Sequence, residues 1–274
     1  MPKLKHMFQT RHHAELYARF RPQPPKELID KIVTYLSEKL ERPFNAALDV
    51  GCGSGQNTRL LAPFFLHVTG TDISSAQLEI AAKDCDSSNI KYQIGSAEKI
   101  ELPSSSLQLV TACQCAHFFD LPKFFEEVDR VLVPNGVLAI YGCNLSAWKE
   151  GREKEITEVF KEFNIDRLEN YRDEQLQLLD NWYQDIIMPY TENVRIFPIN
   201  LVFSRPFGDI VGQVTSWSGV QRMFQEDPQK GDELIKDFRY KLANALELDA
   251  PTDDTIVTCK VIHVLLMGRK PSSF

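Results

Sequence analysis

The sequence lacks the features that mark membrane-spanning and nucleic-acid-binding proteins. No stretch approaches the roughly 18 consecutive apolar residues that a helix needs to cross a bilayer. Basic residues are not in excess, because 31 Lys and Arg stand against 38 Asp and Glu, which leaves a formal net charge of -7. An acidic chain repels phosphate backbones and anionic lipid surfaces, so we expect no membrane and no nucleic acid among its partners.

The sequence also has no disulfide framework and no metal-binding pattern. The six cysteines are scattered, and no two of them form a CxxC pair. Cys113 and Cys115 are spaced to share one face of a strand, but no second cluster completes four ligands, so we expect no metal. Residues 1–9 contain no apolar segment of the kind that a secretory signal has. Reduced thiols and the missing signal favour a cytoplasmic protein.

The length and composition favour one decorated α/β domain. The chain has 274 residues, and 43% of them are hydrophobic, which suffices for a sizeable core. We expect four parts: an N-terminal segment and helix over residues 1–42 that covers a cofactor, a cofactor-binding core over 43–145, a helical lid insertion over 146–198, and closing strands with a helix over 199–274.

Short apolar runs alternate with helical patterns after Pro43. Strands alternating with helices at this pace imply parallel pairing with right-handed crossovers, and hence a doubly wound α/β sheet. We expect strands over 46–50, 66–71, 90–94, 107–112 and 137–141, and helices over 25–40, 56–64, 76–82 and 121–132, the last of them ended by Asn135-Gly136.

Beyond Gly142 the alternation lapses. Residues 148–190 are rich in charged and aromatic side chains and are expected to form the inserted helical lid. Strand character returns over 194–204, a helix is expected over 232–248, and a closing strand over 255–267.

The first strand runs into the segment Asp49-Val-Gly-Cys-Gly-Ser-Gly55. A loop that passes beneath a bound cofactor needs glycines, because a Cβ would collide with the ligand or forbid the required backbone angles. Gly51, Gly53 and Gly55 depart from the dinucleotide fingerprint, which would place its third glycine where Gln56 stands. The acidic Asp49 suits a zwitterionic sulfonium ligand better than a pyrophosphate.

Asp72 stands at the expected end of the second strand, 21 residues after Gly51. A carboxylate at this place can accept hydrogen bonds from both hydroxyls of a ribose, and we also expect the adjacent Ile73 to contact the cofactor. The alternative for Asp72 is the N-cap of the helix that follows, a role that Ser74 could also serve.

These features, together with Gly95-Ser-Ala-Glu98 and Val131-Leu-Val-Pro-Asn-Gly-Val-Leu138, resemble the class I S-adenosylmethionine-dependent methyltransferases. The resemblance spans roughly residues 15–145. It implies S-adenosyl-L-methionine as cofactor and S-adenosyl-L-homocysteine as product. It also implies a Rossmann-like sheet of seven strands, mostly parallel, whose last strand near Thr255–Met267 runs antiparallel.

Three further segments are similar to a small-molecule subgroup of this class that includes trans-aconitate methyltransferase: Tyr17-Ala-Arg-Phe-Arg-Pro, Gln114-Cys-Ala-His-Phe-Phe-Asp120 and Thr215-Ser-Trp-Ser-Gly219. Members of this subgroup mostly methylate small molecules, carboxylates among them. The sequence departs from the subgroup at Phe118, where Trp is common, and from many class I enzymes at Ser96, where Asp is common.

The resemblance also implies roles for individual cofactor-binding residues. Ala97 would meet the adenine through its backbone N–H, with Glu98 nearby, and Gln114 would offer its carbonyl to the methionyl amino group. Tyr17 and Arg21 would cover the cofactor. Arg21 could pair with the methionyl carboxylate, or be an ordinary surface arginine.

His117 is the best-placed residue to act on a methyl acceptor, because it follows the fourth strand at the carboxyl edge of the sheet. A hydroxyl or ammonium acceptor needs proton removal, which a histidine tuned near neutrality would provide, whereas a carboxylate is already ionised. The alternative is a histidine that orders its loop. Trp148 and Trp217 would line an apolar acceptor pocket, or would pack as ordinary helix aromatics.

We therefore expect an enzyme, a methyltransferase that acts on a small molecule, with O-methylation of a carboxylic acid as the first hypothesis. The alternatives are N-, S- or hydroxyl O-methylation of another metabolite, and a non-catalytic protein that binds the same cofactor. The pattern does not predict the acceptor, the oligomeric state, or whether the insertion moves.

Overall fold

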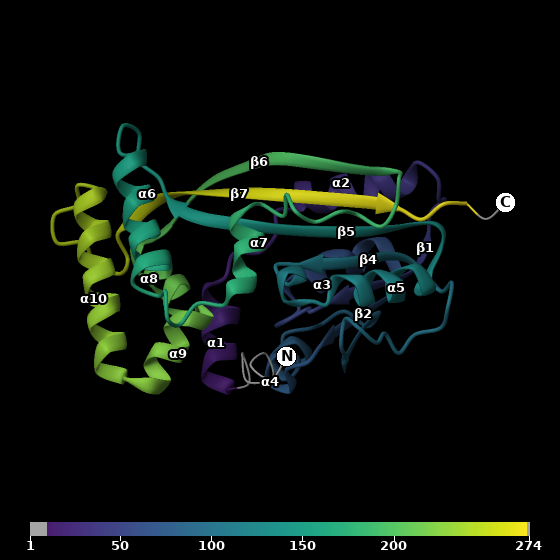
Figure 1. The fold of residues 1–274 in the computed structure, drawn as a ribbon, viewed down its shortest axis with the longest axis horizontal. Coiled ribbons are helices and arrows are strands. Elements are labelled where there is room, and N and C mark those ends of the chain that lie inside the picture. The colour runs from purple at the N-terminus through teal and green to yellow at the C-terminus, as the bar shows by residue number, and fades with distance from the viewer. Residues whose placement is uncertain (1–9, 273–274) are drawn as a thin grey trace.

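The computed structural model describes residues 10–272, so the signal prediction for residues 1–9 lies outside the described residues. Within the described part, seven strands form one sheet in the order β3-β2-β1-β4-β5-β7-β6 (Figure 1). The strands are β1 Phe44–Val50, β2 Phe65–Asp72, β3 Ile90–Ile94, β4 Leu107–Cys113, β5 Leu132–Ala147, β6 Asn193–Pro206 and β7 Ile256–Arg269.

The pairing of the strands confirms the predicted fold class. Strands β1 to β5 pair in parallel, whereas β7 pairs antiparallel with both β5 and β6. The first four strands lie where the sequence predicts them, to within two residues at each end. The fold is a doubly wound, mostly parallel α/β sheet with an antiparallel closing strand.

The fifth strand differs from the prediction. The preceding helix ends at Val131, and β5 begins at Leu132 and continues to Ala147, so Asn135-Gly136 lies inside the strand instead of ending the helix. Asn135 adopts a φ of 64° where the pairing with β4 shifts register. The strand extends past Tyr141 because β7 pairs with it continuously as far as Ala147.

Helices cover both faces of the sheet. On one face α5 (Leu121–Val131) packs its apolar side against alternate residues of β4 and β5. On the other face α2 (Lys26–Ser37) and α3 (Gln56–Leu61) pack against the intervening residues of the same strands. This two-sided burial is why the central strands consist of nearly continuous apolar runs. Helix α4 (Ser75–Lys83) connects β2 to β3.

Strands β5, β6 and β7 extend beyond the rest of the sheet toward a group of helices at one end of the molecule (Figure 1). This helical cap consists of α6 (Glu153–Lys161), α8 (Phe207–Thr215), α9 (Ser218–Glu226) and α10 (Pro228–Ala245). It has its own apolar core, which includes the extended ends of β5 and β7. The short helix α7 is Gln177–Asp180. Of the cap helices, α10 was predicted, α6 lies within the predicted helical insertion, and α8 and α9 were not predicted.

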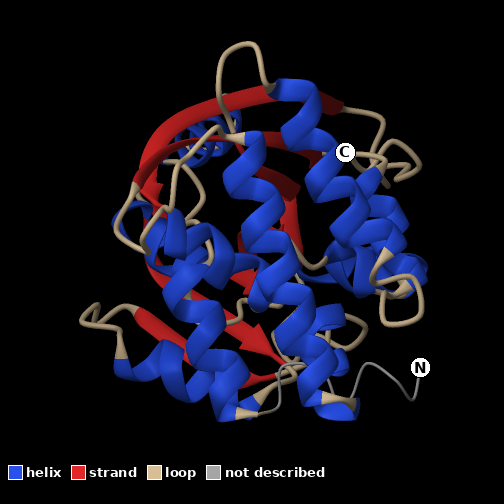
Figure 2. Cartoon of the chain, turned by 90° about the vertical axis from the view of Figure 1, so that its left-hand side faces the viewer, coloured by secondary structure: helices blue, strands red, loops and turns tan. Residues whose placement is uncertain are grey.

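The N-terminal helix α1 (Arg11–Phe20) joins the cap to the sheet domain. It packs against α8 of the cap and against α4 of the sheet domain. Figure 2, which faces the cap end, shows helices crossing in front of the sheet. Among the described residues, no helix combines the length and the apolar character that a bilayer crossing would need.

Candidate functional site

The loop after β1 has the backbone conformation that the glycine pattern predicts. Gly51, Gly53 and Gly55 have φ values of 64°, 53° and 76°. A Cβ on Gly51 would lie 2.9 Å from both the Cβ and the Sγ of Cys115. Left-handed backbone and close packing both exclude other residues, so the loop approaches the end of β4 closely.

Asp49 stabilises this loop through hydrogen bonds to neighbouring side chains. Its carboxylate accepts hydrogen bonds from Asn57 Nδ2 at 2.7 Å, Thr111 Oγ1 at 2.8 Å and Thr58 Oγ1 at 2.6 Å. Burial raises the pKa of Asp49 above its usual value, although these three bonds oppose the rise. Asp49 does not line the cavity described below, so the structure gives it a part in organising the loop.

Asp72 lies at the end of β2 and is hydrogen-bonded to the same glycine loop. Its Oδ2 accepts the Gly53 N–H at 2.9 Å, and its Oδ1 accepts the Ser74 N–H at 2.8 Å. The N-cap of α4 is Ser74, whose hydroxyl accepts the Gln77 N–H, so Asp72 is not the cap. The Ile73 N–H also bonds this carboxylate, and the lone pairs that remain leave Asp72 able to accept hydroxyl groups.

Three further predicted cofactor residues lie after β2 and β3. Ile73 is 52% exposed although it is apolar. Ala97 is buried at the end of β3. Glu98 is held in place by two contacts, because its Oε1 accepts the Asp120 N–H at 3.0 Å and its Oε2 accepts the Ser96 hydroxyl. The side chain of Glu98 is therefore turned toward Asp120.

Helix α1 places Tyr17 and Arg21 over the glycine loop. A Cβ on Gly53 would lie 3.8 Å from Tyr17 Cε1. The guanidinium of Arg21 stacks on the Tyr17 ring at 4.8 Å from its centroid, and Arg21 Nε donates to Ser216 Oγ at 3.0 Å. Arg21 is therefore an internal residue, not a surface arginine.

Helix α1 is hydrogen-bonded both to α3 of the sheet domain and to the end of α8 in the cap. Gln56 donates to the Ala18 carbonyl at 3.2 Å, and His13 Nε2 lies 2.9 Å from the Ser216 carbonyl. His13 is 4% exposed, so it is not a solvated surface residue. Arg205 is likewise engaged, donating to Gln213 Oε1 at 2.9 Å and to the Phe20 carbonyl at 3.1 Å.

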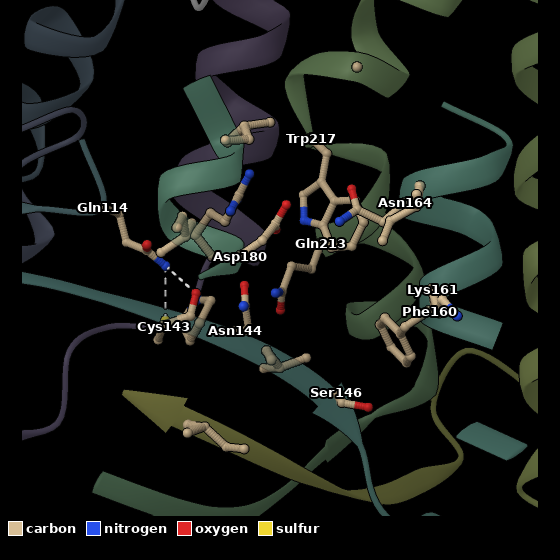
Figure 3. A pocket seen from close by; sticks show the side chains of 18 of the residues that line it. Gln114, Cys143, Asn144, Ser146, Phe160, Lys161, Asn164, Asp180, Gln213 and Trp217 are labelled. Carbon is tan, nitrogen blue, oxygen red and sulfur yellow. Dashed lines mark hydrogen bonds between the residues drawn. The ribbon is translucent and has the colours of Figure 1, made fainter. Parts of the chain in front are cut away.

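A cavity of about 490 Å³ lies between these residues and the helical cap. Figure 3 shows Gln114 and Cys143 at one end of it and Phe160 and Lys161 at the other. Among the predicted site residues, the cavity is lined by Tyr17, Arg21, Gln114, His117, Trp148 and Trp217. The glycines, Asp72, Ile73, Ala97 and Glu98 do not line this cavity, which is called the chamber below.

The cap contributes the far wall of the chamber. Helix α6 continues into a π-helical turn at Glu162–Asp166, a feature that often occurs at functional sites. Side chains three and four positions apart on this segment face the chamber: Glu153, Thr157, Phe160, Lys161, Asn164, Ile165 and Leu168. Trp217, at the N-terminus of α9, lines the chamber and also packs edge-on against Phe163 at 5.7 Å.

Gln114 is strained and internally bonded. Its φ is 60°, its backbone N–H donates to the Tyr141 carbonyl at 2.8 Å, and its Nε2 donates to the Cys143 carbonyl at 2.7 Å. A positive φ is uncommon for a residue with a side chain and clusters at functional sites. The side-chain oxygen is buried and has no partner among the described residues.

His117 lines the chamber in a short 3₁₀ turn after β4. Its Nδ1 lies 2.9 Å from the hydroxyl of Tyr183. Burial, together with the nearby guanidinium groups of Arg21 and Arg172, lowers the pKa of His117 to about 3. The sequence predicts a histidine tuned near neutrality for a hydroxyl or ammonium acceptor, and the burial of this ring acts against that role.

Two residues of the chamber were missed by sequence reasoning. Arg172 and Asp180 both line it and form an ion pair between Arg172 Nη2 and Asp180 Oδ2. The Nε of Arg172 is buried and has no partner among the described residues. Both residues lie within the charged insertion, where nothing in the pattern separates a chamber-facing arginine from a solvated one.

Because three histidines are buried, we predict that the folded protein loses stability in mild acid. Burial lowers the pKa of His13 to about 4, of His117 to about 3 and of His263 to about 4. The unfolded chain binds protons at pH about 6.5, so their stabilising effect is complete above that pH and is lost as pH falls toward 4. Each histidine lowers the free energy of unfolding by about 1.4 kcal/mol per pH unit in that window.

Denaturant unfolding at pH 7.0 and pH 5.5 measures this effect. His13→Asn should reduce the difference in unfolding free energy between the two pH values, whereas replacement of the exposed His12 by Asn should leave it unchanged. Equal stability of the unmodified protein at both pH values would contradict the neutral, buried state of these side chains.

Comparisons with known proteins agree on one family. A family model described as a methyltransferase domain matches residues 48–140. A Dictyostelium discoideum protein provisionally named as a methyltransferase is 36% identical over 203 residues, which cover 74% of each chain. A Saccharomyces cerevisiae protein provisionally named as an S-adenosylmethionine-dependent methyltransferase is 30% identical over 149 residues, 52% of this chain and 48% of the relative.

A solved structure agrees with the fold. The structure of an Anaeromyxobacter dehalogenans protein provisionally named as a type II methyltransferase superposes with a TM-score of 0.72. The superposition covers 92% of this chain and 99% of the other at 24% identity. The shared architecture therefore includes the helical cap as well as the sheet.

Proposed function

This chain belongs to the class I S-adenosylmethionine-dependent methyltransferases, and we propose that it transfers the methyl group of this cofactor to a carboxylate oxygen of a small molecule. The cofactor is S-adenosylmethionine, which supplies an electrophilic methyl group on its sulfonium. The proposal for the acceptor rests on the charges and proton affinities of the groups that line the chamber.

The residues around the glycine loop and the end of β2 fit the cofactor. Asp72 keeps free lone pairs for the two ribose hydroxyls, and the exposed Ile73 provides an apolar surface for a purine. Arg21 has no carboxylate partner among the described residues, and we assign it to the methionyl carboxylate. Gln114 would accept the methionyl ammonium on its backbone carbonyl. The backbone of Ala97 would meet the adenine.

The charge of the chamber favours an anionic acceptor. Arg21 and Arg172 come from distant segments and both lower the pKa of His117. With Arg21 assigned to the methionyl carboxylate, Arg172 is the guanidinium left for the acceptor. Arg172 lines the chamber and can present guanidinium N–H groups to an acceptor there. Arginine binds carboxylates through such directed N–H groups, and the geometry adds specificity to the charge.

The observation that carries the proposal is that, among the described residues, none that lines the chamber offers a competent base for an alcohol. His117 has a pKa of about 3, and burial raises the pKa of Tyr17 to about 12 and of Cys143 to about 11. Of the two lining carboxylates, Asp180 is paired with Arg172, and Glu153 is exposed at the start of α6. A carboxylate acceptor is already ionised at neutral pH and needs no base.

Catalysis in this arrangement comes from alignment. Transfer from a sulfonium is an in-line displacement, and holding the two reactants in the correct geometry can supply much of the rate. The chamber volume of about 490 Å³ lies in the range of small-molecule sites, and its aromatic wall would bury an apolar acceptor body. Trp148 and Trp217 belong to this wall.

A panel of acceptors tests the proposal. Acids of four to ten carbons, with matched alcohols, amines and thiols, are incubated with S-adenosylmethionine while S-adenosylhomocysteine formation is measured. We expect turnover with acids only. Turnover with a matched amine, thiol or alcohol would instead support another acceptor class, and no turnover with bound cofactor would favour a non-catalytic role.

Arg172→Gln should raise the KM of the best acid by about 10-fold or more, because a charge-assisted bond is lost. The affinity for S-adenosylhomocysteine should not change. The double variant Arg172→Gln/Asp180→Asn removes both charges and so excludes repulsion by an unpaired Asp180 as the cause. Arg167→Gln is the matched control, since Arg167 is exposed and pairs with Asp237 outside the chamber. An unchanged KM in both Arg172 variants would contradict the role.

A further inference from the structure

We infer that Tyr183 fixes His117 in the tautomer protonated on Nε2, so that His117 donates a hydrogen bond to the acceptor and does not remove a proton from it. This inference rests on the proposed function for the identity of the acceptor group. Its first half, the tautomer, stands on the geometry of two buried side chains alone.

Tyr183 is placed to act on one ring nitrogen only. It is fully buried, with 0% of its surface exposed, and adopts a φ of 56° in the short connection after α7. Its hydroxyl lies 2.9 Å from His117 Nδ1, and the two rings are nearly parallel at 24°. Among the described residues the hydroxyl has no other hydrogen-bond partner.

The hydrogen bond between the two residues has only one favourable direction. Burial raises the pKa of Tyr183 well above its usual value, so the phenol keeps its proton. If His117 Nδ1 carried a proton, it would donate to the phenol oxygen, and the phenol proton would be buried without an acceptor. Such an unmet buried donor is strongly unfavourable. Tyr183 therefore donates to Nδ1.

A neutral imidazole carries one proton, so accepting on Nδ1 places that proton on Nε2. Nε2 has no partner among the described residues, while His117 lines the chamber. The groups that act on the ring from neighbouring elements are Arg21 of α1, Arg172 of the insertion and the neutral Tyr183, and the two guanidinium groups disfavour a second proton on the ring. The Nε2–H is therefore available to an anionic acceptor.

The proposed donor suits a carboxylate whose second oxygen must be held while the first is methylated. A donor to the non-reacting oxygen orients the acceptor and leaves the other lone pairs free for attack. Tyr183 is a positioning residue in this scheme, because it contacts His117 and not the acceptor. His117 contacts the acceptor itself.

Nitrogen NMR of protein labelled with ¹⁵N-histidine and saturated with S-adenosylhomocysteine tests the tautomer. We expect His117 to show a protonated Nε2 and an unprotonated Nδ1 at pH 7. In Tyr183→Phe, which keeps the ring and removes the donor, both neutral tautomers should be populated. Tyr190→Phe, a buried tyrosine of the same apolar cluster, is the matched control and should leave the signal unchanged.

A protonated Nδ1 or a doubly protonated ring in the unmodified protein would overturn the inference. A pure Nε2–H signal that persists in Tyr183→Phe would overturn the role of Tyr183. Neither reading depends on methyl transfer, so this experiment can succeed or fail independently of the acceptor proposal.

The donor role is tested by two substitutions that mimic different ring nitrogens. The amide nitrogen of His117→Gln reaches close to the position of Nε2, whereas that of His117→Asn lies close to Nδ1. With the best acid of the panel, we expect kcat/KM to fall by about 10- to 100-fold more in His117→Asn than in His117→Gln. Equal losses in the two variants would overturn the donor role. If no acid is methylated, the proposed function fails, and the NMR result still decides the tautomer.

Discussion

Asp72→Ala is expected to weaken the binding of S-adenosylhomocysteine by at least about 100-fold, as measured by titration calorimetry. Asp72 links the glycine loop to the start of α4, because its carboxylate accepts the N–H groups of both Gly53 and Ser74. The same oxygens have free lone pairs for the ribose hydroxyls. Removing them therefore loosens the loop and deletes the ribose contacts together.

Two variants separate these effects. Asp72→Asn keeps the size of the side chain and one acceptor oxygen, so its loss of affinity should be smaller than that of Asp72→Ala. Glu79→Ala removes an exposed carboxylate from the neighbouring helix α4 and should bind normally. Unaltered affinity in Asp72→Ala, with the protein still folded, would contradict the assignment of this carboxylate to the cofactor.

Gly55→Ala is expected to lower the free energy of unfolding by about 3 kcal/mol or more, through strain and overpacking. Gly55 has a φ of 76°, and a Cβ there would lie 2.2 Å from Tyr92 Oη. The ring of Tyr92 cannot move away easily, because a Cβ on Gly70 would lie only 2.8 Å from its Cδ1. The ring is thus held between the glycine loop and β2.

Gly151 provides the matched control for this prediction. It has a φ of 75°, but a Cβ there would meet nothing within 4 Å. Gly151→Ala therefore reports the backbone strain alone and should cost about 1 kcal/mol. Chemical denaturation of both variants measures the difference. Similar losses at the two positions would show that contact with Tyr92 does not constrain the loop.

The cofactor half of the molecule could be predicted from the sequence because its chemistry is local. The glycine loop and Asp72 lie within one β-α-β unit, where the chain order itself brings them to one sheet edge. The strands of this half are buried on both faces, so their apolar runs stand out. The exception is β5, whose length depends on pairing with β7, more than 100 residues away in the chain.

The acceptor half could not be predicted to the same depth because it is assembled from distant segments. Arg172 and Tyr183 lie in an insertion rich in charged and aromatic residues, and only the tertiary structure shows which of them face inward. His117 was identified from its place after β4, but its low pKa depends on burial by Tyr183 and on two arginines. Helices α8 and α9 lie in segments whose sequence pattern did not indicate a helix, so they were missed.

The measurement that tests the proposed reaction most directly locates the transferred methyl group. The enzyme is incubated with the best acceptor of the panel and S-adenosylmethionine that carries a trideuterated methyl group. The mass of the product is then measured by mass spectrometry before and after treatment with mild alkali. Methyl esters hydrolyse under these conditions, whereas methyl groups on nitrogen, sulfur or an ether oxygen remain. We expect the label to be released and the original acid to be recovered, and label that survives alkali would contradict methylation of a carboxylate.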